Sequence, residues 1–80
     1  MHERHMVVAA VEAIKAELNK DGSKLVCASF AVGELSGISP ESVKFYFDEI
    51  TAGTTLEGAV LKFSNVPDKR GLELIGIETQ

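Results

Sequence analysis

The chain has 80 residues, enough for one small domain, and its 45% hydrophobic and 25% charged residues are typical of a globular protein rather than a disordered one. The net charge of −4 argues against non-specific binding of nucleic-acid phosphates, because such binding needs a basic face.

Cysteine usage and hydropathy bear on the compartment. Cys27 is the single cysteine, so no disulfide forms within one chain and no CxxC zinc pair exists. No secretory signal is present, and no stretch approaches the roughly 20 apolar residues that span a bilayer. We therefore expect a protein of the cytoplasm that binds neither membranes nor nucleic acid.

The first predicted element is a helix over residues 6–18. Apolar residues recur there at helical spacing and form one stripe, which consists of Val7, Ala10, Val11, Ile14 and Leu18. The stripe is either a partner-binding surface or core, and in so short a chain core is the favoured interpretation. Asp21 and Gly22 follow, and glycine readily adopts the left-handed conformation that ends a helix.

Residues 24–32 predict a strand that is apolar on both faces and therefore central in its sheet. Alternation places Val26, Ala28, Phe30 and Val32 on one face, with Leu25, Cys27, Ser29 and Ala31 on the other. Cys27 is interpreted as a small buried hydrophobic residue, because no electropositive setting that would activate its thiol is visible.

A second helix is predicted over residues 40–51. Ser39 is a good N-cap, Pro40 suits the first helical position, and Glu41 favours the positive end of a helix. We interpret Glu34, Ser39 and Glu41 as turn and capping residues. One face of the helix carries Val43, Phe47 and Ile50, with Tyr46 at its edge.

Two further strands are predicted over residues 58–66 and 72–79. The short connection between them favours an antiparallel hairpin, and a change of alternation near Ile75 and Gly76 indicates a bulge. The expected fold is α+β, a small mixed three-stranded sheet with two helices in the order helix, strand, helix, strand, strand. The segment from the first strand to the second permits a parallel crossover, and two helices on one face would leave the other face open.

Catalytic motifs are absent from the sequence. It has no GxxxxGK[ST] or GxGxxG phosphate loop and no GxSxG nucleophile elbow. The only histidines, His2 and His5, stand at the start of the chain, far from any candidate nucleophile. We therefore expect the protein not to be an enzyme.

The opening "MHE" offers metal donors instead. The α-amine of Met1, the amide nitrogen of His2 and the imidazole of His2 can form two fused chelate rings around one metal ion. Deprotonating an amide requires strong planar bonding, which points to Ni(II) or Cu(II) rather than Zn(II) or Mg(II). Glu3, His5 or a nearby carboxylate would fill the fourth position. On these residues alone, a solvated terminus remains an alternative.

The chain resembles the HypA/HybF family of hydrogenase-maturation nickel metallochaperones. The resemblance rests on "MHE" at residues 1–3, on "VGELSGISPESVKFYFDEIT" and "LEGA" within residues 32–59, and on "LELIGIE" at residues 72–78. It implies a nickel-binding domain over residues 1–80, with Met1, His2 and Glu3 as the Ni(II) site. It also implies delivery to the hydrogenase large-subunit precursor together with the GTPase HypB, and in some bacteria to urease.

The sequence departs from that family at three points. Family members usually insert a zinc lobe with two CxxC pairs between the last two strands, whereas this chain has the short turn "VPDKRG" at residues 66–71, so no zinc is expected. Ser39 stands where the family often has an acidic residue, so Glu34 or Glu41 would have to substitute for it. His5 lies outside the usual motif and is either a solvated side chain or the fourth nickel donor.

Two other hypotheses remain open. The chain could be a metal-independent adaptor that docks on HypB or on the hydrogenase precursor, through its helices or the open face of its sheet. It could also be a structural or regulatory oligomer, since the short connection between the last two strands favours strand exchange between chains.

Overall fold

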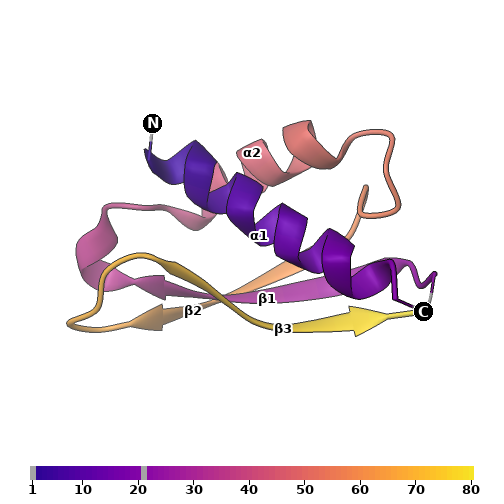
Figure 1. Cartoon of the computed structure of the whole chain (residues 1–80). Coiled ribbons are helices and arrows are strands. Elements are labelled where there is room, and N and C mark those ends of the chain that lie inside the picture. The colour runs from indigo at the N-terminus through magenta and orange to yellow at the C-terminus, as the bar shows by residue number, and fades with distance from the viewer. Residues whose placement is uncertain (1, 21) are drawn as a thin grey trace.

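The structure is a computed structural model of the whole chain, and it describes residues 2–20 and 22–80 (Figure 1). The elements follow in the order α1 (His2–Leu18), β1 (Leu25–Gly33), a 3₁₀ turn η1 (Glu34–Ser36), α2 (Pro40–Thr51), β2 (Val60–Val66) and β3 (Leu72–Thr79). Figure 1 shows both helices on the same side of a three-stranded sheet. The predicted α+β fold and element order are confirmed.

The sheet is mixed, with β1 in the middle and the strands in the order β2-β1-β3. β1 pairs in parallel with β2 and antiparallel with β3. The parallel pair is joined through α2, which is the crossover that the sequence permits. β1 takes the centre because both of its faces are largely apolar, which confirms that prediction.

The core lies between the helices and the sheet. The apolar stripe of α1 is buried there, so its interpretation as core is confirmed: Val7, Val11 and Ile14 have no exposed surface and Leu18 has 3%. Val43 and Phe47 of α2 are also fully buried, and Phe30 of β1 faces them within the same cluster. Phe30 stacks on Phe63 of β2 with ring centroids 5.9 Å apart, which ties the two parallel strands together below α2.

The predicted hairpin between the last two strands is wrong. β2 and β3 are the two edges of the sheet, and each pairs with β1 rather than with the other. Residues 67–71 therefore cross the carboxyl end of β1, where the Gly33 amide donates a hydrogen bond to the Gly71 carbonyl at 2.9 Å. A short connection favours a hairpin when the two strands that it joins have no better partner. Here the more apolar β1 is the better partner for both β2 and β3.

The bulge expected near Ile75 is confirmed. The pairing of β1 with β3 goes from Ser29–Gly76 to Phe30–Leu74, so Ile75 has no partner residue, and it is 56% exposed. A second register shift, between Leu25 and Cys27, was not expected.

The second shift corrects the predicted faces of β1. Leu25 joins the core at 2% exposure, whereas Val26 is 39% exposed, the reverse of strict alternation. Cys27 is a free cysteine and is buried, as expected.

The boundaries of three elements also differ from the prediction. α1 begins at His2 rather than near Met6, because polar residues continue a helix whose apolar stripe starts later. β1 and β2 begin at Leu25 and Val60 rather than at residues 24 and 58. α2 keeps the predicted bounds, and Gly22, at φ 72°, donates its amide to the Leu18 carbonyl just after α1.

Candidate metal site at the start of the first helix

The sequence-predicted site falls on the first turn of α1. Met1 and the side chain of His2 lie outside the described residues, whereas the backbone from His2 onward is helical. The first four N–H groups of a helix have no carbonyl partner within it. The backbone amides of this turn are therefore not engaged in helical hydrogen bonds.

Glu3 contributes an unsatisfied oxygen to this turn. The residue is half-buried, and its Oε2 atom is buried with no hydrogen-bond partner among the described residues. A buried acceptor left without a partner costs roughly 1–3 kcal/mol, so this oxygen gains from any donor or cation that reaches it. Its negative charge is favoured beside the positive end of the helix.

His5 lies on a different side of the helix. Residues two apart on a helix do not face each other, and His5 is exposed whereas Glu3 is half-buried. The described part of the chain contains no group of three or more histidine, cysteine, aspartate or glutamate side chains placed to hold a metal ion. The structure thus leaves Glu3 and His5 apart.

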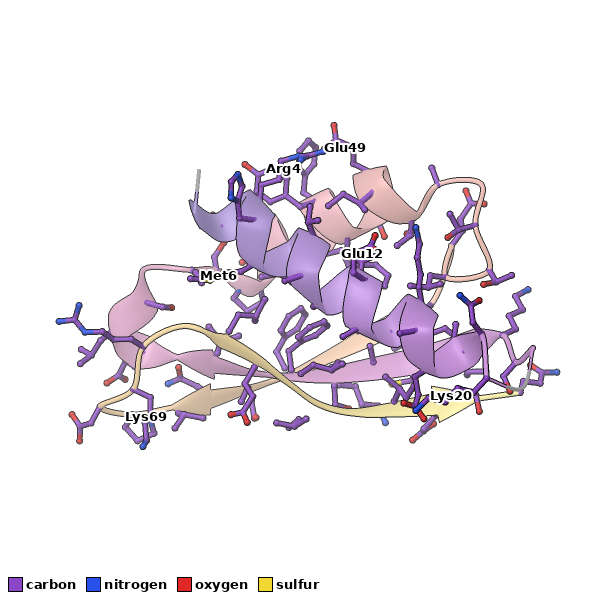
Figure 2. All side chains as sticks on the ribbon, viewed as in Figure 1. Arg4, Met6, Glu12, Lys20, Glu49 and Lys69 are labelled. Atoms are coloured by element: carbon purple, nitrogen blue, oxygen red, sulfur yellow. The ribbon has the colours of Figure 1, made fainter. Side chains whose placement is uncertain are left out.

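An ion pair holds the same turn against α2. Arg4 Nε lies 3.9 Å from Glu49 Oε1, and Figure 2 shows the two labelled side chains meeting across the helices. Both side chains are about half exposed, at 52% and 56%, so the pair adds at most about 1 kcal/mol.

The loop before α2 has a structural explanation at Ser39. Ser39 Oγ accepts a hydrogen bond from the Ser42 amide at 3.2 Å, which caps the helix as predicted. The two carboxylates considered as substitutes, Glu34 and Glu41, are both exposed. Glu34 Oε2 accepts a long hydrogen bond of 3.5 Å from Asn65 Nδ2 at the end of β2.

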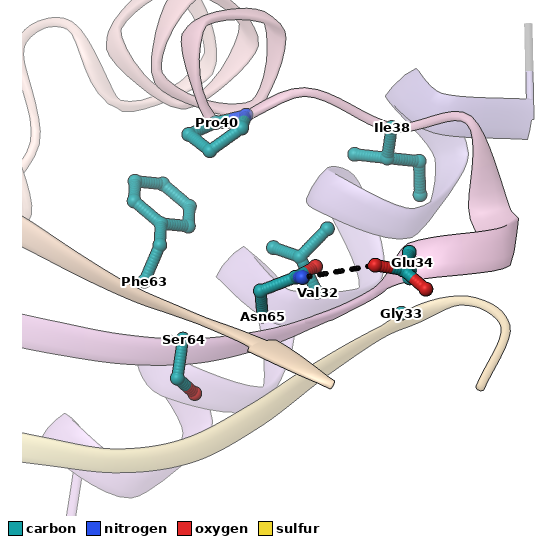
Figure 3. A pocket seen from close by; sticks show the side chains of 8 residues that line it. All are labelled: Val32, Gly33, Glu34, Ile38, Pro40, Phe63, Ser64 and Asn65. Atoms are coloured by element: carbon teal, nitrogen blue, oxygen red, sulfur yellow. Dashed lines mark hydrogen bonds between the residues drawn. The ribbon is translucent and has the colours of Figure 1, made fainter. Parts of the chain in front are cut away.

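Sequence reasoning missed the cavity beside Glu34. It has a volume of about 220 Å³ and lies between the carboxyl ends of β1 and β2 and the segment that enters α2 (Figure 3). Its lining residues are Val32, Gly33, Glu34, Ile38, Pro40, Phe63, Ser64 and Asn65. Only the parallel pairing, which sets Gly33 beside Val66, brings these distant segments together.

None of the helices in the described part of the chain has the length and apolar character needed to cross a membrane.

Comparisons with known proteins point to one family. Residues 1–70 match the family model described as hydrogenase/urease nickel incorporation, metallochaperone, HypA. The closing "LELIGIE", part of the resemblance noted above, lies beyond the matched residues.

Three relatives are each named hydrogenase maturation factor HypA. The Lawsonia intracellularis protein is 40% identical over 68 residues, which cover 84% of this chain and 58% of that protein. The Geobacter sulfurreducens protein is 39% identical, over 86% of this chain and 61% of the relative. The Caldanaerobacter subterraneus protein is 43% identical, over 82% of this chain and 59% of the relative.

The chain thus spans less than two thirds of the length of these relatives. The family model, which matches most of the chain, describes a metallochaperone, and the relatives are named maturation factors, so the family is not one of enzymes. The chain belongs to the HypA family of nickel-incorporation metallochaperones.

Proposed function

We propose that this chain binds Ni(II) through Met1, His2 and Glu3 and delivers it for the maturation of [NiFe]-hydrogenase. The observation that carries the proposal is the match to a nickel-incorporation family model from residue 1, which includes the "MHE" segment. The proposed donors are the α-amine of Met1, the amide nitrogen and imidazole of His2, and an oxygen or backbone atom of Glu3.

The start of α1 suits this donor set in one respect and opposes it in another. Its amide nitrogens are not used by the helix, so a metal can take them without breaking a helical hydrogen bond. The positive end of the helix dipole repels a dication. Loss of an amide proton and the carboxylate of Glu3 offset that repulsion, because each brings a negative charge to the metal.

Two residues compete for the fourth position. The buried, unpartnered Oε2 atom of Glu3 supports Glu3, since metal binding would satisfy that oxygen. Exposed His5 is the alternative donor, and as an imidazole it also suits Ni(II). We propose Glu3 as the residue that matters more.

The remaining parts of the proposal rest on the family. We propose that residues 1–80 act as a nickel-binding domain in which the turn at residues 66–71 takes the place of a zinc lobe, so that zinc is not required. The partners would be the GTPase HypB and the hydrogenase large-subunit precursor. The cytoplasm is the proposed location, consistent with a free Cys27 in a reducing compartment.

A metal-independent adaptor is the second candidate. The observation that favours it is the uncovered side of the sheet, where Val60 and Ile75 are 57% and 56% exposed. In this alternative the sheet docks on HypB or on the precursor, and exchange of β3 between two chains would form a dimer.

Calorimetric titration with Ni(II) separates these candidates. Tag-free protein is compared with His2→Ala, Glu3→Gln and His5→Ala, whose new residues are good helix formers. We expect one tight site that His2→Ala abolishes, that Glu3→Gln weakens and that His5→Ala leaves within about threefold. Equal, weak binding by the parent protein and His2→Ala would reject the nickel proposal and favour the adaptor.

A further inference from the structure

The cavity beside Glu34 has no role in the proposed nickel chemistry. Figure 3 shows Phe63 and Asn65 on the helix side of the sheet, below Ile38 and Pro40, whereas Ser64 points to the opposite side. Phe63 is held in place by its stacking on Phe30. The cavity therefore has a fixed aromatic floor near the edge strand β2.

Charge is unbalanced at the rim of the cavity. Glu34 is exposed, and within the described residues its carboxylate has no cationic partner and only the long hydrogen bond from Asn65. Four of the eight lysines and arginines of the chain are engaged in ion pairs elsewhere, namely Arg4, Lys15, Lys20 and Lys44. The Glu34 carboxylate and the Phe63 ring stand at opposite ends of the cavity, so a cationic head bound at Glu34 would lay its stem toward the ring.

The size of the cavity restricts the ligand. Pockets for drug-sized molecules are about 300–1,000 Å³, whereas this one is about 220 Å³. Its apolar lining suits an aliphatic stem, and its acidic rim suits a charged head. Lysine and arginine side chains have that construction.

The strand that borders the cavity is an unprotected edge. β2 pairs with β1 over its whole length without a register shift, contains no proline and carries one charged residue, Lys62. β3, the other edge, has two register shifts and two exposed glutamates, Glu73 and Glu78. Bulges and charges deter pairing with further strands, so β2 is the edge open to addition of a strand.

These two features lie side by side. A strand added to β2 would turn every second side chain toward the helix side of the sheet, where Phe63 and Asn65 border the cavity. We propose that the β2 edge and the Glu34 cavity together bind an extended segment of a partner protein, with one lysine or arginine of that segment in the cavity. This inference does not depend on nickel binding.

Selection from a displayed library of random nine-residue peptides tests the proposal. The full chain is the target, and the strongest peptides are then synthesised for measurement of dissociation constants. We expect selected peptides to share one lysine or arginine between β-branched residues. For an arginine peptide, replacing the arginine by neutral citrulline should weaken binding about tenfold or more. N-methylation of alternate backbone nitrogens should abolish binding.

Matched variants test which carboxylate of the chain contacts the cationic side chain of the peptide. Glu34→Gln should weaken binding of the selected peptide about tenfold, whereas Glu73→Gln, an exposed glutamate on the opposite edge, should leave it within twofold. In ¹⁵N-labelled protein, amide shifts on adding peptide should concentrate on residues 60–66 and on Glu34. His2→Ala should bind the peptide like the parent chain, so failure of the nickel proposal would leave this result unaffected.

Three outcomes would overturn the inference. The first is a library that yields no binder above background. The second is a set of binders whose affinity is the same for Glu34→Gln and Glu73→Gln. The third is a concentration-dependent shift of residues 60–66 in the free chain, which would make a second copy the occupant of the β2 edge.

Discussion

A Cβ atom built on Gly33 would lie 2.6 Å from the carbonyl oxygen of Lys69. Gly33 is the last residue of β1, and Lys69 belongs to the connection that crosses over it from β2 to β3. The Leu35 amide donates a hydrogen bond to the same Lys69 carbonyl at 2.9 Å. This bond holds the crossing connection close to the end of β1. Glycine is needed here for lack of space, at an ordinary φ of −70°.

Gly33→Ala should therefore destabilise the fold. The contacts to be displaced are backbone atoms, and overpacking of this kind costs typically about 1–3 kcal/mol. Urea denaturation followed by circular dichroism would give the free energy of unfolding. Gly76→Ala is the matched control, because Gly76 has an ordinary φ and a Cβ atom added there would meet no atom within 4 Å. Equal stability of the two variants would contradict the crossing connection.

Ser39→Ala should lower the stability of the chain by about 1 kcal/mol. The substitution removes the hydroxyl that accepts a hydrogen bond from the Ser42 amide, and so leaves the first turn of α2 uncapped. Ser39→Asp should keep the parent stability, because aspartate caps as well as serine and its charge suits the helix start. Thermal unfolding of both variants measures the effect, and a loss of stability in Ser39→Asp would show that Ser39 has another role.

The thiol of Cys27 should react slowly in the native protein. Cys27 is 3% exposed and lies between Val60 and Glu78 in the sheet register, so a reagent reaches it only after the sheet opens. If opening requires global unfolding, which costs about 5 kcal/mol or more, the rate with a disulfide reagent should be lower than that of the chain in urea by more than about a thousandfold. A native rate near that of the unfolded chain would place Cys27 on an accessible surface.

The sequence predicts most of the fold because helix and strand periodicities are strong here. The cap at Ser39 and the bulge at Ile75 follow from local residue types, and the structure has both. The central place of β1 follows from its two apolar faces, but the pairing of the last two strands does not follow from local pattern. The preference for a hairpin after β2 is outweighed by the pairing of both later strands with β1, which is a property of the whole sheet.

Some features of the candidate site could also be predicted from the sequence, and others could not. "MHE" is visible in the sequence because its donors are adjacent along the chain, whereas the helical start at His2 and the unpartnered Oε2 of Glu3 are features of folding. The Glu34 cavity had no sequence signal, because its lining comes from two segments far apart along the chain that only the parallel pairing joins.

The nickel proposal should also give a distinctive pH dependence. Its amine, amide and imidazole donors must all lose protons or be neutral to bind, so Ni(II) affinity should rise steadily as the pH rises from about 6 to about 8. Titrations at several pH values would measure this slope. An affinity independent of pH over that range would exclude an amide nitrogen as a ligand.

Native mass spectrometry of the chain with Ni(II) tests the central claim most directly, using protein with a free α-amine and protein acetylated at Met1. We predict one nickel ion on the free chain and loss of that ion on acetylation. Equal nickel occupancy of the free and acetylated chains would contradict a site built on Met1 and His2.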